Sequence, residues 1–230
     1  MLILKYILIG LLCVLPSVVL GQVAHDVTSA ASGLSVSHTR GAISNPYALA
    51  CVTSRNAALD FTAVSYGGVA MTQLAEQTAA NQRAELWGLI NPASGAQPVT
   101  ATGGDNNNTI IVSTFSGVHQ TIPTGTVQSV NTSGGFGESL NITVSTDGLG
   151  VDCLGHGLVE TLVVGAGQTE RAEQSSDDST SAVSTEGSTG TVTMSYSWAT
   201  EHYTAYIAIP LEPAAIVGAS TRVPTAIFVE

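Results

Sequence analysis

The sequence predicts an all-β protein: a single antiparallel β-sandwich of jelly-roll-like or Ig-like type that follows an N-terminal signal peptide. Charged residues make up only 10% of the chain, which is rich in Gly, Ser, Thr and Val. From Val27 onward, short apolar alternations are separated by Gly, Asn, Asp and Pro every ~8–12 residues, as in sandwiches and barrels. A length of 230 residues suits one large all-β domain. We therefore expect a signal peptide over residues 1–21, a sandwich domain over 22–213 and a tail over 214–230.

The N-terminal segment has the pattern of an export signal. One cation, Lys5, precedes an apolar run that is broken by Pro16 and ends on the small residue Gly21. This order predicts a cleavable signal peptide with cleavage before Gln22, and the alternative is a retained anchor or pilin-like helix. A lipoprotein signal is not indicated, because Leu12 rather than a small residue precedes Cys13. We expect a secreted protein, extracellular or at the cell surface, with no membrane contact after cleavage.

Two cysteines remain in the mature chain, Cys51 and Cys153. An even count in an exported protein favours a disulfide. Both lie in strand-like segments, and Cys153 shares a strand face with Leu149 and Val151, so its side chain is expected to point into the core. We predict a buried Cys51–Cys153 disulfide; the alternative is a pair of unpaired core thiols, since free cysteine packs as a small hydrophobe.

The strands are expected in order along the chain, separated by turns that have a stated mechanism. The glycine pair Gly67-Gly68 predicts a tight hairpin, because glycine adopts positive φ without steric cost. Residues 173–188 are rich in Ser, Thr, Asp and Glu, which predicts a mobile exposed loop. No internal repeat is visible at a fixed period. The expected strands are 35–39, 47–53, 61–66, 70–74, 84–90, 99–102, 109–115, 140–145, 149–154, 160–164, 168–172, 192–198 and 203–209, with 226–229 able to form one more.

Several of these turns and strands, taken together, resemble a pattern found in a group of known proteins. They are Tyr66-Gly67-Gly68-Val69-Ala70-Met71-Thr72, then Trp87 with Asn91-Pro92-Ala93-Ser94-Gly95, Phe115-Ser116-Gly117-Val118-His119-Gln120-Thr121, Val164-Gly165-Ala166-Gly167-Gln168-Thr169 and the strand 206–210. In this order they resemble a loosely defined family of extracellular β-sandwich modules of microbial surface and secreted proteins. The resemblance spans residues 27–213 and implies fold and location. It implies no activity, since none is established for these modules, and the tail is a departure from their pattern.

Charge and motifs argue against several functions. Once residues 1–21 are removed, five arginines face 17 acidic residues, a net charge of −12, so nucleic acid is a poor partner. No Gly-x-Ser-x-Gly elbow occurs, and the five histidines form no zinc-binding motif. His156, between two glycines, could be exposed at a turn, where a lone histidine is most often structural or neutral, and Asp105 with the asparagines after it is expected at a solvated turn. We expect no catalytic residue, no metal and no cofactor, and hence no enzyme.

Two groups of residues are candidates for an involvement with sugars, one as glycosylation sites and one as carbohydrate contacts. Asn107, Asn131 and Asn141 begin N-glycosylation sequons, and Asn141 lies in an expected strand, so its use requires an outward side chain. Trp198 and Tyr203 are candidate carbohydrate contacts, because exposed aromatic rings stack on sugars. Against this, Tyr196 and Trp198 share one face of a strand, as core residues do.

These observations favour a secreted structural or adhesive protein of the cell surface or extracellular matrix. Assembly with copies of itself, as a homo-oligomer or fibre, would use strand addition at an open sheet edge, with the tail as a candidate donor. The alternative is a carbohydrate-binding, lectin-like module assisted by calcium, with surface glycans as partners.

Overall fold

The computed structural model describes residues 19–105 and 107–216, which form strands and turns. This described part contains no helix long and apolar enough to cross a membrane. The strands are β1 (Val19–Leu20), β2 (Ala24–Ser32), β3 (Ser35–Arg40), β4 (Tyr47–Ser54), β5 (Phe61–Tyr66), β6 (Val69–Ala70), β7 (Thr72–Ala79), β8 (Gln82–Ile90), β9 (Gly95–Gly103), β10 (Asn108–Ser116), β11 (Gln128–Thr132), β12 (Gly137–Val144), β13 (Leu149–His156), β14 (Val163–Val164), β15 (Thr169–Ser175), β16 (Thr180–Glu186), β17 (Gly190–Ser197), β18 (Thr204–Leu211) and β19 (Ala215–Ile216).

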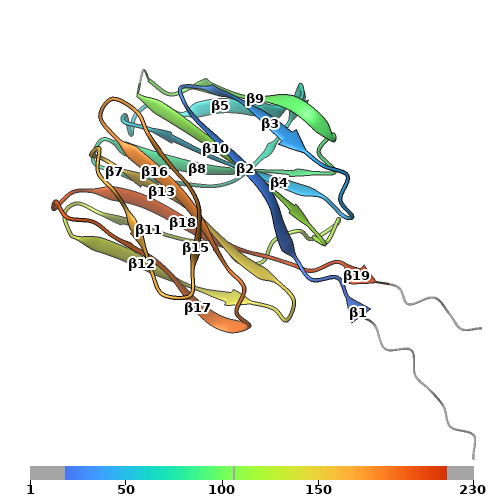
Figure 1. Ribbon diagram of the computed structural model, residues 1–230. Helices are drawn as coiled ribbons and strands as arrows, with labels where there is room; N and C mark the ends of the chain where they lie inside the picture. The colour runs from blue at the N-terminus through green and yellow to red at the C-terminus, as the bar shows by residue number, and fades with distance from the viewer. Residues whose placement is uncertain (1–18, 106, 217–230) are drawn as a thin grey trace, which may run out of the picture.

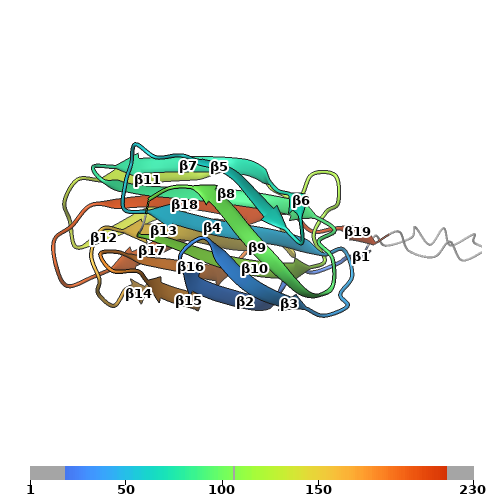
Figure 2. The same ribbon diagram turned by 90° about the horizontal axis from the view of Figure 1, so that it is seen from above.

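Four antiparallel sheets stack as layers (Figures 1 and 2). The two inner sheets have the strand orders β2-β10-β4-β8-β7 and β11-β18-β13-β16-β15. The outer sheets are β3-β9-β5-β6, which covers the first inner sheet, and β12-β17-β14, which covers the second. The predicted all-β antiparallel sandwich is confirmed, and the structure adds that it has four layers, two sandwiches placed face to face.

The two halves of the chain have the same topology. Each inner sheet places its strands in the same relative order, with β2 matching β11, β10 matching β18, β4 matching β13, β8 matching β16 and β7 matching β15. In the outer sheets β3, β9 and β5 match β12, β17 and β14. The repeat escapes the sequence because the offset between matching strands varies, from 95 residues (Gly95 to Gly190) to 104 (Ala24 to Gln128). We call residues 24–116 the first module and 128–211 the second.

Three hydrophobic cores separate the four layers. The central core lies between the inner sheets and includes Cys51, Leu86, Ile111, Cys153 and Ile207. The other two lie between each inner sheet and its outer sheet. Strands β4 and β13 are buried along their whole length, because both faces of an inner sheet are covered.

The prediction of a mobile loop over 173–188 is wrong. This segment holds the end of β15, a turn and strand β16, whose residues Thr180–Thr185 are buried. Its hydroxyl groups are paired: Ser181 Oγ lies 2.5 Å from Thr53 Oγ1 and receives a hydrogen bond from Thr109 Oγ1 (2.6 Å). Polar composition misleads here because Ser and Thr can satisfy one another between sheets.

The two ends of the described residues meet at one pole of the molecule, where β1 pairs with β19 (Figure 1). Gly21 N donates to Ala214 O (2.9 Å), and Val23 N donates to Asp147 O (2.8 Å). Most of the predicted signal peptide, residues 1–18, and the predicted strand at 226–229 lie outside the described residues.

Candidate functional site

The predicted disulfide is present. Cys51 of β4 and Cys153 of β13 are bonded, with their Cα atoms 5.5 Å apart, in the central core. The prediction that Cys153 faces the core is therefore confirmed, and its neighbour Asp152 points to the opposite face, as alternation along a strand requires.

The carbohydrate candidates lie in different environments. Trp198 is 6% exposed, and its Nε1 donates to Gly135 O (2.7 Å), so its ring offers no open face for stacking. Tyr203 is half-buried, and the Arg55 guanidinium already lies over its ring, 4.8 Å from the centroid. The two residues do not form an exposed aromatic platform.

The three sequon asparagines differ in accessibility. Asn131 and Asn141 are exposed, whereas Asn107 is half-buried and donates to Asp178 Oδ2 (3.0 Å). Asn141 lies on the outer face of β12, where its Oδ1 accepts a hydrogen bond from Thr193 Oγ1 (2.7 Å). The outward orientation that glycosylation of Asn141 requires is therefore met.

His156 is not exposed at a turn. Its side chain is fully buried at the end of β13, with Nδ1 3.0 Å from Leu158 O. Gly155 lies within β13 and Gly157 directly follows it, and both are sites of close packing, because a Cβ on Gly155 or Gly157 would collide with Gln82 or Tyr203. Among the residues that the structure describes, no group of three or more His, Cys, Asp or Glu side chains is arranged to hold a metal ion.

A buried carboxyl group marks the core of the second module. Asp152 receives hydrogen bonds from Ser184 N (2.6 Å), Ser184 Oγ (2.7 Å), Tyr206 OH (2.9 Å), Tyr196 OH (3.2 Å) and Gln168 Nε2 (3.2 Å). Burial nevertheless raises the pKa of this carboxyl to about 7. The network ties β13 to both β16 and β17, and because Asp152 is 0% exposed its role is structural.

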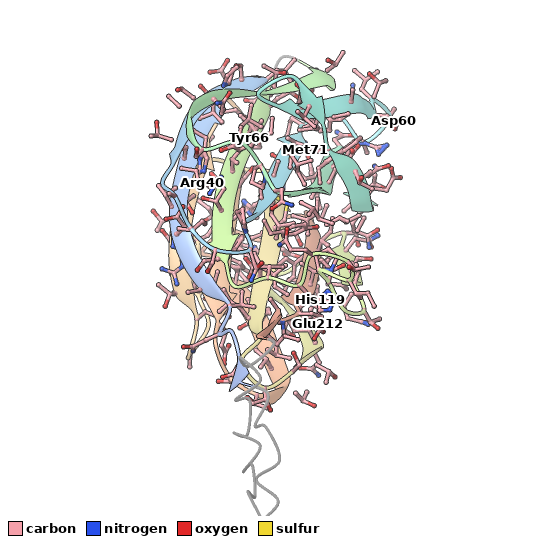
Figure 3. All side chains as sticks on the ribbon, turned by 90° about the vertical axis from the view of Figure 1, so that its right-hand side faces the viewer. Arg40, Asp60, Tyr66, Met71, His119 and Glu212 are labelled. Carbon is pink, nitrogen blue, oxygen red and sulfur yellow. A yellow bond between two sulfur atoms is a disulfide. The ribbon has the colours of Figure 1, made fainter. Side chains whose placement is uncertain are left out.

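A cavity of about 440 Å³ lies at the pole where β1 pairs with β19, near His119 and Glu212 (Figure 3). Ser145 Oγ donates to Glu212 Oε2 (2.7 Å), while His119 Nδ1 accepts hydrogen bonds from Thr121 N and Ile122 N (3.1 Å each). The histidine lone pair is thereby occupied, so His119 is not placed as a base for the serine.

The outer sheets have regular open edges. In the first module, Ala101 N donates to Leu34 O (2.8 Å), one step before the β3–β9 ladder begins. Antiparallel alternation then directs the backbone groups of Val36, His38 and Arg40 toward β9. The backbone N–H and C=O groups of Ser35, Ser37 and Thr39 point away from the sheet. All three residues have small, polar and exposed side chains.

The matching edge of the second module has the same arrangement. Trp198 N donates to Phe136 O (3.0 Å), which extends the β12–β17 ladder by one step. The backbone groups that point away from β17 therefore belong to Gly137, Ser139, Asn141 and Thr143. All four residues are exposed, and β12 runs for eight residues without a break in register.

The remaining long edges are interrupted. The ladder register shifts around Asp26 in β2, Thr62 in β5, Leu74 in β7 and Arg171 in β15. Strand β11 has five residues, and β6 and β14 have two each. Bulges and short strands protect sheet edges against pairing with other chains, and β3 and β12 are the longest edge strands of the described residues that have an unbroken register. Sequence reasoning placed strands at both positions but did not identify them as a site, although the alternation of small polar with apolar residues was a signal for an exposed strand.

Comparison of the chain with family models, with curated proteins and with solved structures found no match.

Proposed function

We propose that this chain is an extracellular structural or adhesive protein that assembles with copies of itself through the edges of its outer sheets. The observation that carries the proposal is the pair of unbroken edge strands β3 and β12, whose outward backbone groups have no strand partner in the described body. Main-chain hydrogen bonds at such edges provide affinity without a shaped pocket.

The construction of the body supports a mechanical role. Three stacked cores and one buried disulfide join the four layers into a stiff unit. The disulfide also agrees with an oxidising location outside the cytoplasm. An acidic surface with no lysine in the mature chain favours solubility between assembly events.

The carbohydrate-binding alternative loses its main support, because Trp198 is buried. The cavity near His119 and Glu212 holds no exposed aromatic side chain to stack on a sugar ring. We therefore retain self-assembly as the single proposal.

The test compares the oligomeric state of two chains by light scattering and electron microscopy. The first is residues 22–230. The second ends at Ile216, because an earlier cut at Leu211 would remove a fully buried residue of β18. We expect both chains to form particles larger than a monomer. A chain 22–230 that stays monomeric at every concentration would contradict the proposal, and assembly lost only in 22–216 would assign it to the tail instead.

A further inference from the structure

We infer that β12 of one copy pairs antiparallel with β3 of the next copy, so that an outer sheet continues from molecule to molecule. This inference rests on the proposed function and names its interface. It is drawn from three features of the two strands: which residues direct their backbone N–H and C=O groups out of the sheet, where the strands lie in the molecule, and what charge they carry.

The residues whose backbone N–H and C=O groups point out of the sheet match between the two strands. Ser35, Ser37 and Thr39 present N–H and C=O groups outward from β3, and Ser139, Asn141 and Thr143 do so from β12. With Ser37 opposite Asn141, Ser35 faces Thr143 and Thr39 faces Ser139. Every outward residue then meets an outward residue, which is the condition for a hydrogen-bonded antiparallel pair. No bulky side chain projects from these positions to keep the backbones apart.

The two strands lie on opposite sides of the molecule. Strand β3 packs beside β2, which faces β15 across the central core, while β12 packs beside β11, which faces β7. The β2–β15 and β7–β11 pairs form the two flanks of the inner sheets, and β3 and β12 also belong to opposite outer layers (Figures 1 and 2). A contact between unlike edges at opposite flanks leaves one edge free at each end of every oligomer, so further copies can add; the rotation between copies decides between an open chain and a ring.

Charge favours the unlike pairing over the two like pairings. Strand β3 contains one cation, Arg40, and no acid, whereas β12 contains Glu138 and no base; His38 is fully buried and its pKa is lowered by burial, so it adds no charge. The register with Ser37 opposite Asn141 also places Arg40 opposite Glu138. Arg40 is buried, and its two terminal guanidinium nitrogens donate to Gly41 O (2.8 Å) and Pro92 O (2.6 Å), while its Nε has no hydrogen-bond partner in the described structure. Pairing β12 with β12 would instead bring two glutamates into one interface, and pairing β3 with β3 two arginines.

Proline substitutions test the interface, because proline removes an outward N–H and is tolerated where an edge N–H faces solvent. The variants are Ser139→Pro on β12 and Ser37→Pro on β3. Their matched controls, Ser139→Ala and Ser37→Ala, remove the hydroxyl and keep the N–H. Circular dichroism and thermal unfolding verify the fold. If a proline variant does not fold, Ser139→Lys or Ser37→Lys replaces it, since an edge lysine opposes pairing without touching the inner ladder.

We expect each proline variant of the chain 22–230 to be monomeric at the concentration at which the unaltered chain assembles. The concentration needed for assembly should rise at least tenfold. The alanine controls should assemble like the unaltered chain. An equimolar mixture of the two proline variants should form a dimer and nothing larger. The unaltered β3 of the Ser139→Pro variant pairs with the unaltered β12 of the Ser37→Pro variant, and the two edges left on the dimer are both blocked by proline. A single proline variant that still forms dimers would overturn the unlike pairing, and assembly unaffected by both would place the interface elsewhere. A monomeric unaltered chain would instead refute the proposed function itself.

Discussion

Cys51 and Cys153 occupy the same position in the two modules: each is the fifth residue of the central strand of its inner sheet. Their disulfide therefore joins the modules at matching points, where the two inner sheets face each other. The chain is in effect a pair of similar sandwiches joined by a covalent bond between equivalent positions.

Removal of this disulfide should destabilise the whole body. The bond closes a segment of 102 residues, and loss of such a constraint costs about 2–5 kcal/mol. We expect this decrease in the free energy of unfolding for the double variant Cys51→Ala/Cys153→Ala, measured by denaturant titration. Mass spectrometry of the unaltered protein should detect no alkylated thiol at either position without reduction, and alkylation there would contradict the bond.

Asp152 should make stability depend on pH. Folding raises the pKa of this carboxyl from 3.8 to about 7, chiefly through burial. Between those values the native state binds more protons than the unfolded state, so the free energy of unfolding must fall as the pH rises through this window. A shift of this size corresponds to roughly 4 kcal/mol.

The variant Asp152→Asn isolates this contribution. Burial lowers the pKa of His25, His38, His156 and His202, which has the opposite effect, a loss of stability as the pH falls below about 6.5. The measurement is therefore the difference between the unaltered protein and the variant, by denaturant titration from pH 4 to 8. The difference should change steadily up to about pH 7 and then level off; a difference that is constant with pH would contradict the raised pKa.

Trp198 should behave as a core residue. Its side chain is 6% exposed and donates a hydrogen bond to Gly135 O, so Trp198→Ala should lower the free energy of unfolding by about 3–5 kcal/mol. Tyr203→Ala, at a half-buried position, should have a smaller effect. A Trp198→Ala protein of unchanged stability that had lost glycan binding would favour the carbohydrate interpretation.

A glycan at Asn141 should block assembly. Asn141 lies on the proposed pairing edge of β12 with its side chain exposed, so an attached sugar would keep a second strand away. In a host that glycosylates exported proteins, we expect chains modified at Asn141 to be monomeric by light scattering. Thr143→Ala, which removes only the sequon, should restore assembly, whereas Asn131→Gln, on β11, should have no effect on it. Efficient assembly of chains fully modified at Asn141 would argue against this edge.

Much of the fold could be predicted from the sequence because local patterns determine it. The spacing of turn residues predicted most strands, and alternation placed Cys153 toward the core. The loop predicted over 173–188 failed for the converse reason: its hydroxyl groups find partners on β4 and β10 of the facing inner sheet, which local composition does not reveal. The burial of His156 is likewise not visible in the sequence, since it depends on Trp198 and His202, whose rings lie 4.9 and 5.6 Å from its own.

The sequence by itself determined an all-β chain with a core disulfide, because strand period, turn chemistry and cysteine count act over short distances or by simple arithmetic. Only the tertiary structure decided that two similar sandwiches lie face to face, that Cys51 and Cys153 are equivalent, and that β3 and β12 are open edges. Each of these depends on which strands become neighbours, and strand order is set by packing between residues about 100 positions apart. The candidate site belongs to this second group, since a sheet edge exists only once every other strand has found its partner.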